Sequence, residues 1–103
     1  MVLYTTENIP GKEYEALGLV KGNTVQSKHI GKDIGAGLKT LVGGEIRGYT
    51  DLLMESRNIA TERMIQDAES LGADAIVCVR YATSQIMESA AEVLAFGTAV
   101  KFK

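Results

Sequence analysis

The stretch that most constrains the fold is Ala90–Phe102, where larger and smaller apolar residues alternate. A period of two places successive side chains on opposite faces of a β-strand. The larger side chains are Leu94, Phe96, Val100 and Phe102, and those of the other face are Ala91, Val93, Ala95, Gly97 and Ala99. A face of small residues lets a helix lie close to the sheet. The bulkier face then needs another cover, for which a second subunit is the simplest candidate.

The helix expected on this sheet spans residues 51–71, with Thr50 as its cap and Gly72 as its stop. At 100° per residue, one narrow side of this helix is apolar, and this apolar stripe consists of Leu53, Ala60, Met64, Ala68 and Leu71. Met54 and Ile65 fall outside the stripe, so a helix that packs only on its own sheet has no use for them.

The remaining elements are three strands and a shorter helix. Residues 2–5 indicate a short strand, Tyr14–Ser27 a long strand with a bend or bulge at a glycine, and residues 75–83 a strand covered on both faces. Asp33 can cap the shorter helix, which ends at Gly43 and Gly44. We therefore expect one α+β domain over residues 1–103, ordered β-β-α-α-β-β, with an antiparallel sheet and both helices on one face.

Charge and composition exclude several classes of partner. The 103 residues carry a formal net charge of −2, which does not favour binding to the phosphate backbone of nucleic acids. No apolar run reaches the ~18 residues of a membrane span, and the N-terminus lacks the basic region of a signal peptide. The single cysteine, Cys78, fits a reducing compartment, so we expect a cytoplasmic protein.

Residues 21–47 are mainly basic and residues 51–69 mainly acidic, which indicates either two solvated faces or complementary patches between subunits.

Several short motifs are distinctive when taken together. They are 33–37 (DIGAG), 43–45 (GGE), 48–50 (GYT), 71–75 (LGADA), 79–81 (VRY) and 96–99 (FGTA), with Arg57, Ala60, Arg63, Met64 and Ala68 between them. This set resembles the YbjQ-like family of small bacterial and archaeal proteins, which carries a heavy-metal-binding label, and the resemblance covers essentially the whole chain. It implies an α+β fold assembled into a ring-like homopentamer, and it implies no reaction and no catalytic residues.

The candidate metal ligands are His29 and Cys78, the only histidine and cysteine in the chain. A soft-metal site needs several thiolates or imidazoles around one ion. Cys78 lies between Val77 and Val79, where core packing is the stronger interpretation, and His29 fits an exposed loop. A ring of identical chains could still gather copies of either residue around its axis. Carboxylates such as Asp74 suit a harder ion, but their spacing does not require one.

A second set of candidates could hold an anion or form a subunit interface. Gly35 and Gly37 open the shorter helix, where free amide groups attract anions; the alternative is close backbone packing. Arg57 and Arg63 border the apolar stripe of the longer helix, and Arg63 is spaced to pair with Asp67. Tyr49 precedes that helix and could supply an acidic hydroxyl group at an interface.

The sequence favours a homopentameric binding module for a metal ion or a small ligand, with other copies of itself as its partners. A structural or protein-interaction scaffold without a ligand is the alternative. An enzyme with a site at subunit interfaces is the weaker alternative, because the chain has no Ser/His/Asp or Cys/His signature.

Overall fold

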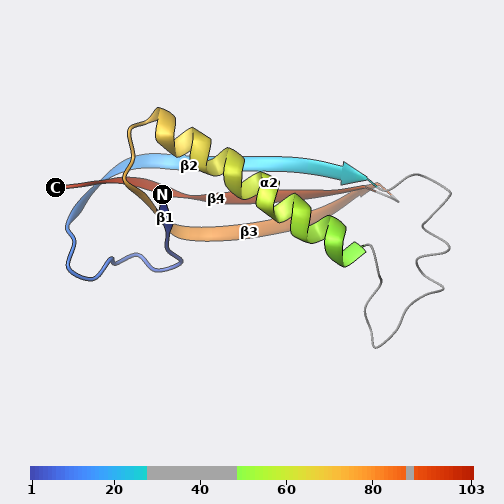
Figure 1. Cartoon of the computed structure of the whole chain (residues 1–103), viewed down its shortest axis with the longest axis horizontal. Helices are drawn as coiled ribbons and strands as arrows, with labels where there is room; N and C mark the ends of the chain where they lie inside the picture. The colour runs from blue at the N-terminus through green and yellow to red at the C-terminus, as the bar shows by residue number, and fades with distance from the viewer. Residues whose placement is uncertain (28–48, 88–89) are drawn as a thin grey trace.

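The computed structural model describes residues 1–27, 49–87 and 90–103. A helix, α2 (Tyr49–Ser70), crosses one face of a four-stranded sheet obliquely (Figure 1). The α+β class and the longer helix are confirmed, whereas the shorter helix expected after Asp33 lies outside the described residues. The strands are β1 (Val2–Leu3), β2 (Tyr14–Ser27), β3 (Ala75–Met87) and β4 (Ala90–Phe102), and they lie side by side in the order β1-β3-β4-β2.

The sheet is mixed, so the expectation of a purely antiparallel sheet is wrong. β4 pairs antiparallel with both β2 and β3, but β1 runs parallel to β3, with Val2 opposite Ala75. After β1 the chain crosses to the far edge of the sheet through residues 4–13, here called the N-terminal arm, and enters β2 in the same direction. A strand of only two residues is too short for its sequence pattern to indicate whether it pairs parallel or antiparallel.

The small-residue face of β4 lies under α2, as the alternation predicted. Gly22 on β2 brings the helix closest to the sheet: a Cβ atom built there would lie 2.3 Å from the backbone oxygen of Ala60 and 2.3 Å from the backbone nitrogen of Met64. Only a residue without a side chain permits this approach. The core beneath α2 consists of Val20, Ala60, Met64, Ala68, Ile76, Val79, Val93, Ala95 and Ala99.

The C-terminal end of α2 is closed by Gly72, as predicted. Gly72 has a φ of +76°, and the amide of Ala73 donates to the carbonyl oxygen of Ala68 while that of Gly72 donates to Glu69. This pair of hydrogen bonds is the Schellman motif, which satisfies the last free carbonyl groups of a helix. Leu71 was expected in the core but is 48% exposed, because the motif turns the chain away before it can pack.

The bulge expected at a glycine of β2 is confirmed. The register with β4 shifts between Ala16 and Gly18, and Gly18 has a φ of +135°, a value that side chains other than glycine rarely allow. Beyond the bulge, Val20 faces the helix and packs in the core. The bulge therefore sets which residues of β2 are buried.

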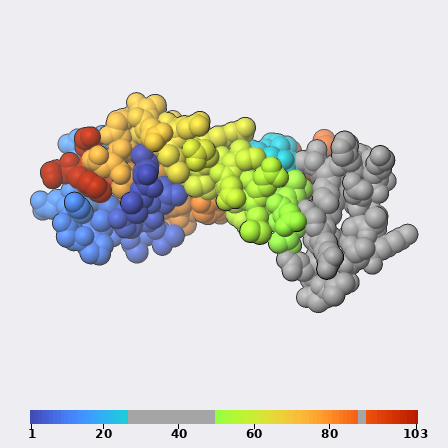
Figure 2. All heavy atoms as spheres, in the orientation of Figure 1, coloured from blue at the N-terminus to red at the C-terminus, as the bar shows by residue number. Residues whose placement is uncertain are grey.

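Among the described residues, the face opposite α2, here called the open face, is covered at one end only. There the N-terminal arm buries Ile9 against Ala75, Val77 and Val100, and Lys12 places its ammonium group 5.0 Å from the centre of the Phe102 ring. The N- and C-terminal residues gather at this end of the molecule (Figure 2). Further along, the register places Leu19, Val25, Leu94 and Phe96 on the open face, where the described residues provide no second layer.

Candidate functional site

The predicted site residues divide between described and undescribed parts of the chain. His29, Gly35 and Gly37 fall in residues 28–48, outside the described residues. Tyr49 is the first residue of α2, but its side chain is likewise outside the description. Arg57, Arg63 and Cys78 are described, and the structure does not bring them together as one site.

Arg63 and Asp67 hold the backbone of the edge strand β2 rather than each other. The Arg63 Nη1 atom donates to the carbonyl oxygen of Asn23 at 2.7 Å, and the Asp67 Oδ2 atom accepts from the amide of Lys21 at 3.1 Å. The predicted ion pair between Arg63 and Asp67 is therefore wrong. Their i, i+4 spacing does place them on one side of the helix, but there they meet unpaired backbone groups of the sheet edge.

Replacing Arg63 with alanine is expected to lower the free energy of unfolding by about 1 kcal/mol, because one charged hydrogen bond to the edge is lost. Arg57→Ala is the matched control on the same helix: Arg57 is exposed, so its loss should change stability by less than about 0.5 kcal/mol. Urea unfolding followed by circular dichroism measures both. Equal effects for the two variants would contradict the structural role of Arg63.

Arg57 is exposed on α2, whereas the sequence placed it at the border of the apolar stripe rather than facing solvent. Its carbonyl oxygen accepts from the Thr61 hydroxyl group at 2.7 Å, and the Thr61 Oγ1 atom lies 2.7 Å from the Tyr81 hydroxyl oxygen. This chain of polar contacts ties the middle of α2 to β3. Sequence inspection missed it, because Thr61 and Tyr81 lie on different elements and share no motif.

Cys78 occupies a bulge and is half-buried. The register between β3 and β4 shifts between Val77 and Arg80, and Cys78 has a φ of +56°, which is uncommon for a residue other than glycine. The bulge directs the amide of Cys78 to the carbonyl oxygen of Thr6 at 3.2 Å. Cys78 therefore helps to anchor the N-terminal arm, and its side chain packs against the buried cluster around Ile9.

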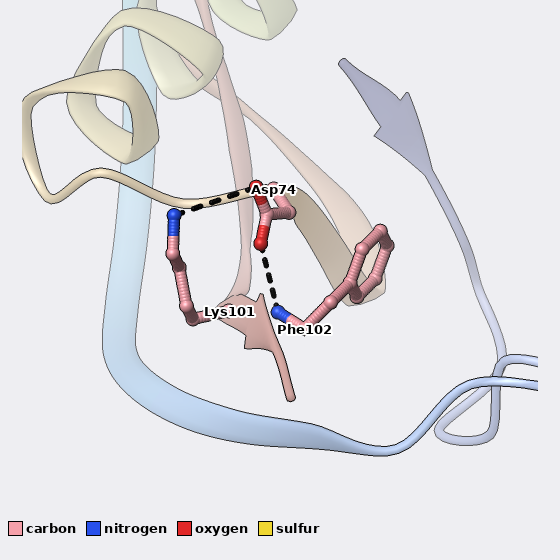
Figure 3. A network of polar contacts seen from close by, with 3 residues as sticks. All are labelled: Asp74, Lys101 and Phe102. Atoms are coloured by element: carbon pink, nitrogen blue, oxygen red, sulfur yellow. Dashed lines mark hydrogen bonds and ion pairs between the residues drawn. The ribbon is translucent and has the colours of Figure 1, made fainter.

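The carboxylate of Asp74 contacts residues at the end of β4 and is therefore not an unpaired candidate ligand for a metal ion (Figure 3). Its Oδ2 atom accepts from the amide of Phe102 at 2.8 Å, and its Oδ1 atom lies 3.6 Å from Nζ of Lys101. Within residues 1–27, 49–87 and 90–103, no three side chains of His, Cys, Asp or Glu cluster as metal ligands would. In the same ranges no helix has the length and apolar character that crossing a bilayer requires.

Exposed apolar residues of the described chain occur on the open face and along the outer half of β3. Leu19 is 66% exposed and Val25 53% exposed on β2, while every residue from Arg80 to Met87 on β3 is exposed. The sequence predicted that β3 would be covered on both faces, and this holds only as far as Val79. The bulge at Cys78 and the end of the N-terminal arm limit the covered part.

Comparison with known proteins places this fold and sequence in a family. A protein named "UPF0145 protein" from Pseudothermotoga lettingae is 66% identical over 104 residues, covering 100% of this chain and 98% of the relative. Another with that name, from Vibrio campbellii, is 61% identical over 102 residues, covering 98% of each. The crystal structure of a protein of unknown function from Pediococcus pentosaceus, assigned to the DUF74 family, shares the fold with a TM-score of 0.69 at 16% identity, covering 100% of this chain and 98% of its own. The YbjQ_1 family, described as "Putative heavy-metal-binding", matches residues 1–103, and this chain belongs to it.

Proposed function

We propose that this chain is a subunit of a ring-like homopentamer in the cytoplasm, and that the assembly binds a metal ion or a small ligand where copies meet. The observation that carries the proposal is the open face. Leu19 and Val25 expose more than half of their surface on this face, which also carries the half-buried Leu94 and Phe96 on the neighbouring strand, with Lys21 and Asn23 between Leu19 and Val25. Large exposed apolar residues gathered on one face of a sheet are typical of a binding interface.

The metal part of the proposal is supported by the family description and by the chemistry of two residues. Heavy metal ions prefer thiolate and imidazole ligands, and several must converge on one ion. Each chain contributes one thiol, at Cys78, and one imidazole, at His29. A ring multiplies these single ligands by the number of copies, so its symmetry axis is where a shared site would form.

The binding proposal is tested with the assembled protein and a panel of soft divalent metal ions. We expect a thermal-stability shift that saturates at a fixed ratio of metal to subunit and weakens in Cys78→Ser or His29→Ala. Asn58→Ala, at an exposed position on α2, is the control and should retain the full shift. Elemental analysis of protein purified without added metal gives an independent measure of occupancy. No shift with any metal ion would contradict the proposed metal site.

The alternative candidate is a protein-interaction scaffold, and the same open face favours it. A scaffold needs the apolar surface for partners but no ligand. An assembled protein that binds neither metal ions nor small anions, while keeping its oligomeric mass, would favour the scaffold over the binding module.

A further inference from the structure

The two edges of the sheet differ in how they are protected. At the β2 edge, Arg63 and Asp67 of α2 bond the outward-facing backbone groups of Asn23 and Lys21. At the other edge, β1 pairs only with the start of β3, and the N-terminal arm continues the cover to Val79, whose amide donates to the carbonyl oxygen of Tyr4 at 2.9 Å. Beyond Val79 the β3 edge continues to Met87 with every residue exposed.

The register identifies the backbone groups that point outward from this β3 edge. Lys21 and Asn23 point their backbone groups away from β4, so their partners Phe96 and Leu94 point theirs toward β3. Phe96 pairs with Arg80 and Leu94 pairs with Ala82, which uses the backbone groups of those two residues.

Tyr81 and Thr83 therefore point their amide and carbonyl groups outward. Among residues 1–27, 49–87 and 90–103, β3 has no neighbouring strand on that side after Ile76. No backbone bond from the N-terminal arm reaches beyond Val79 in those ranges. Two adjacent outward positions thus offer two donors and two acceptors to an incoming strand.

Between the register shifts of β3 at Val77/Arg80 and Gln85/Met87, the sequence carries neither the charges nor the proline that normally prevent strand addition. Residues 81–87 contain no charged residue and no proline, and they include the aromatic Tyr81, the β-branched Thr83 and Ile86, and Met87. Tyr81 is 45% exposed, Ile86 51% and Met87 59%. Native proteins usually protect such an edge with lysine, proline, a bulge or a covering element. Within the described residues, α2 covers the β2 edge at Lys21 and Asn23, whereas from Tyr81 to Thr83 the β3 edge has no covering strand, charge or proline between its two register shifts, which favours its use as a contact.

We propose that a second copy of this chain adds a strand to the β3 edge, with backbone hydrogen bonds at Tyr81 and Thr83. The identical chain fits because residues 81–87 carry no charge, so this edge repels neither an acidic nor a basic strand of the neighbouring copy. In a ring each contact is head-to-tail, so the neighbouring copy pairs through a segment other than its own residues 81–87. The edge is also continuous with the open face, since Ala82 lies beside Leu94, and an added strand extends the surface that needs a cover. Because α2 closes the β2 edge, the incoming strand is not β2. This inference rests on the self-assembly in the proposed function and specifies its contact.

Amide hydrogen exchange tests the proposed contact directly. We expect the amides of Tyr81 and Thr83 to be protected in concentrated protein and to lose that protection on dilution to the monomer. The amides of Arg80 and Ala82, which face β4 within the chain, should stay protected in both states and are the internal control. The double variant Ala82→Lys with Thr83→Lys adds charges at exposed positions and should shift the protein toward the monomer. Gln66→Lys, exposed on α2, adds a charge away from β3 and should leave the assembly intact.

The outcomes separate this inference from the proposed function. An assembly in which the Tyr81 and Thr83 amides exchange rapidly at every concentration overturns the edge contact and leaves self-assembly standing. A protein that remains monomeric at every concentration overturns both. Protection that arises only when a different protein is added also overturns the inference, because the occupant would then not be a second copy.

Discussion

Gly22→Ala is expected to lower the free energy of unfolding by about 3 kcal/mol, a large part of the stability of a small domain. The new methyl group would lie 2.3 Å from backbone atoms of Ala60 and Met64, and backbone within a packed helix cannot move aside as a flexible side chain can. The whole of α2 must therefore shift away from the sheet. Urea unfolding followed by far-UV circular dichroism, at one fixed protein concentration, measures the loss.

Lys21→Ala is the control for this substitution, because it places the same methyl group on the adjacent residue of β2. The Lys21 side chain is exposed, so its replacement should change stability by about 0.5 kcal/mol or less. If Gly22→Ala were as stable as Lys21→Ala, the close approach of α2 to β2 would be wrong.

Met64→Ala is expected to cost 2–5 kcal/mol, the usual range for removing a large buried side chain. Met64 is fully buried between α2 and the sheet, so its truncation leaves a cavity in the main core. Met54→Ala makes the same chemical change on the same helix at a position that is 52% exposed, and it should cost less than about 0.5 kcal/mol. Thermal and urea unfolding of the two variants give the difference. Similar losses for both would show that α2 packs on a different side.

Elements with a regular period could be predicted from the sequence. The alternation in Ala90–Phe102 gave both the strand and the side on which the helix lies, and the apolar stripe with Gly72 gave the longer helix and its end. In both cases the information is local, because neighbouring residues of one element share one environment. The need for a cover on the bulkier face of β4 followed from the same alternation.

Features that depend on pairing between distant segments could not be predicted. The direction of β1 depends on two residues meeting β3, and the partners of Arg63 and Asp67 depend on which strand lies at the sheet edge. The bulge at Cys78 changes the face of every later residue in β3 and has no glycine to mark it. The absence of charge from residue 81 to residue 87 was the available signal of an unprotected edge.

The candidate site was predictable only in part for the same reason. A single cysteine and a single histidine can be read directly from the sequence, but whether they converge depends on how copies are arranged. Arg63 was correctly placed beside the apolar stripe, and its role proved to be holding the β2 edge. A stripe position indicates where a side chain lies on a helix and does not identify its partner.

The molar mass of the folded protein in dilute solution tests the central claim most directly, namely that copies of this chain cover the open face. Light scattering on protein eluting from a sizing column, at micromolar concentration, is expected to give about five times the mass of one chain. A cooperatively folded protein with the mass of a single chain would contradict the account, because the apolar residues of the open face would then be stable in water without a partner.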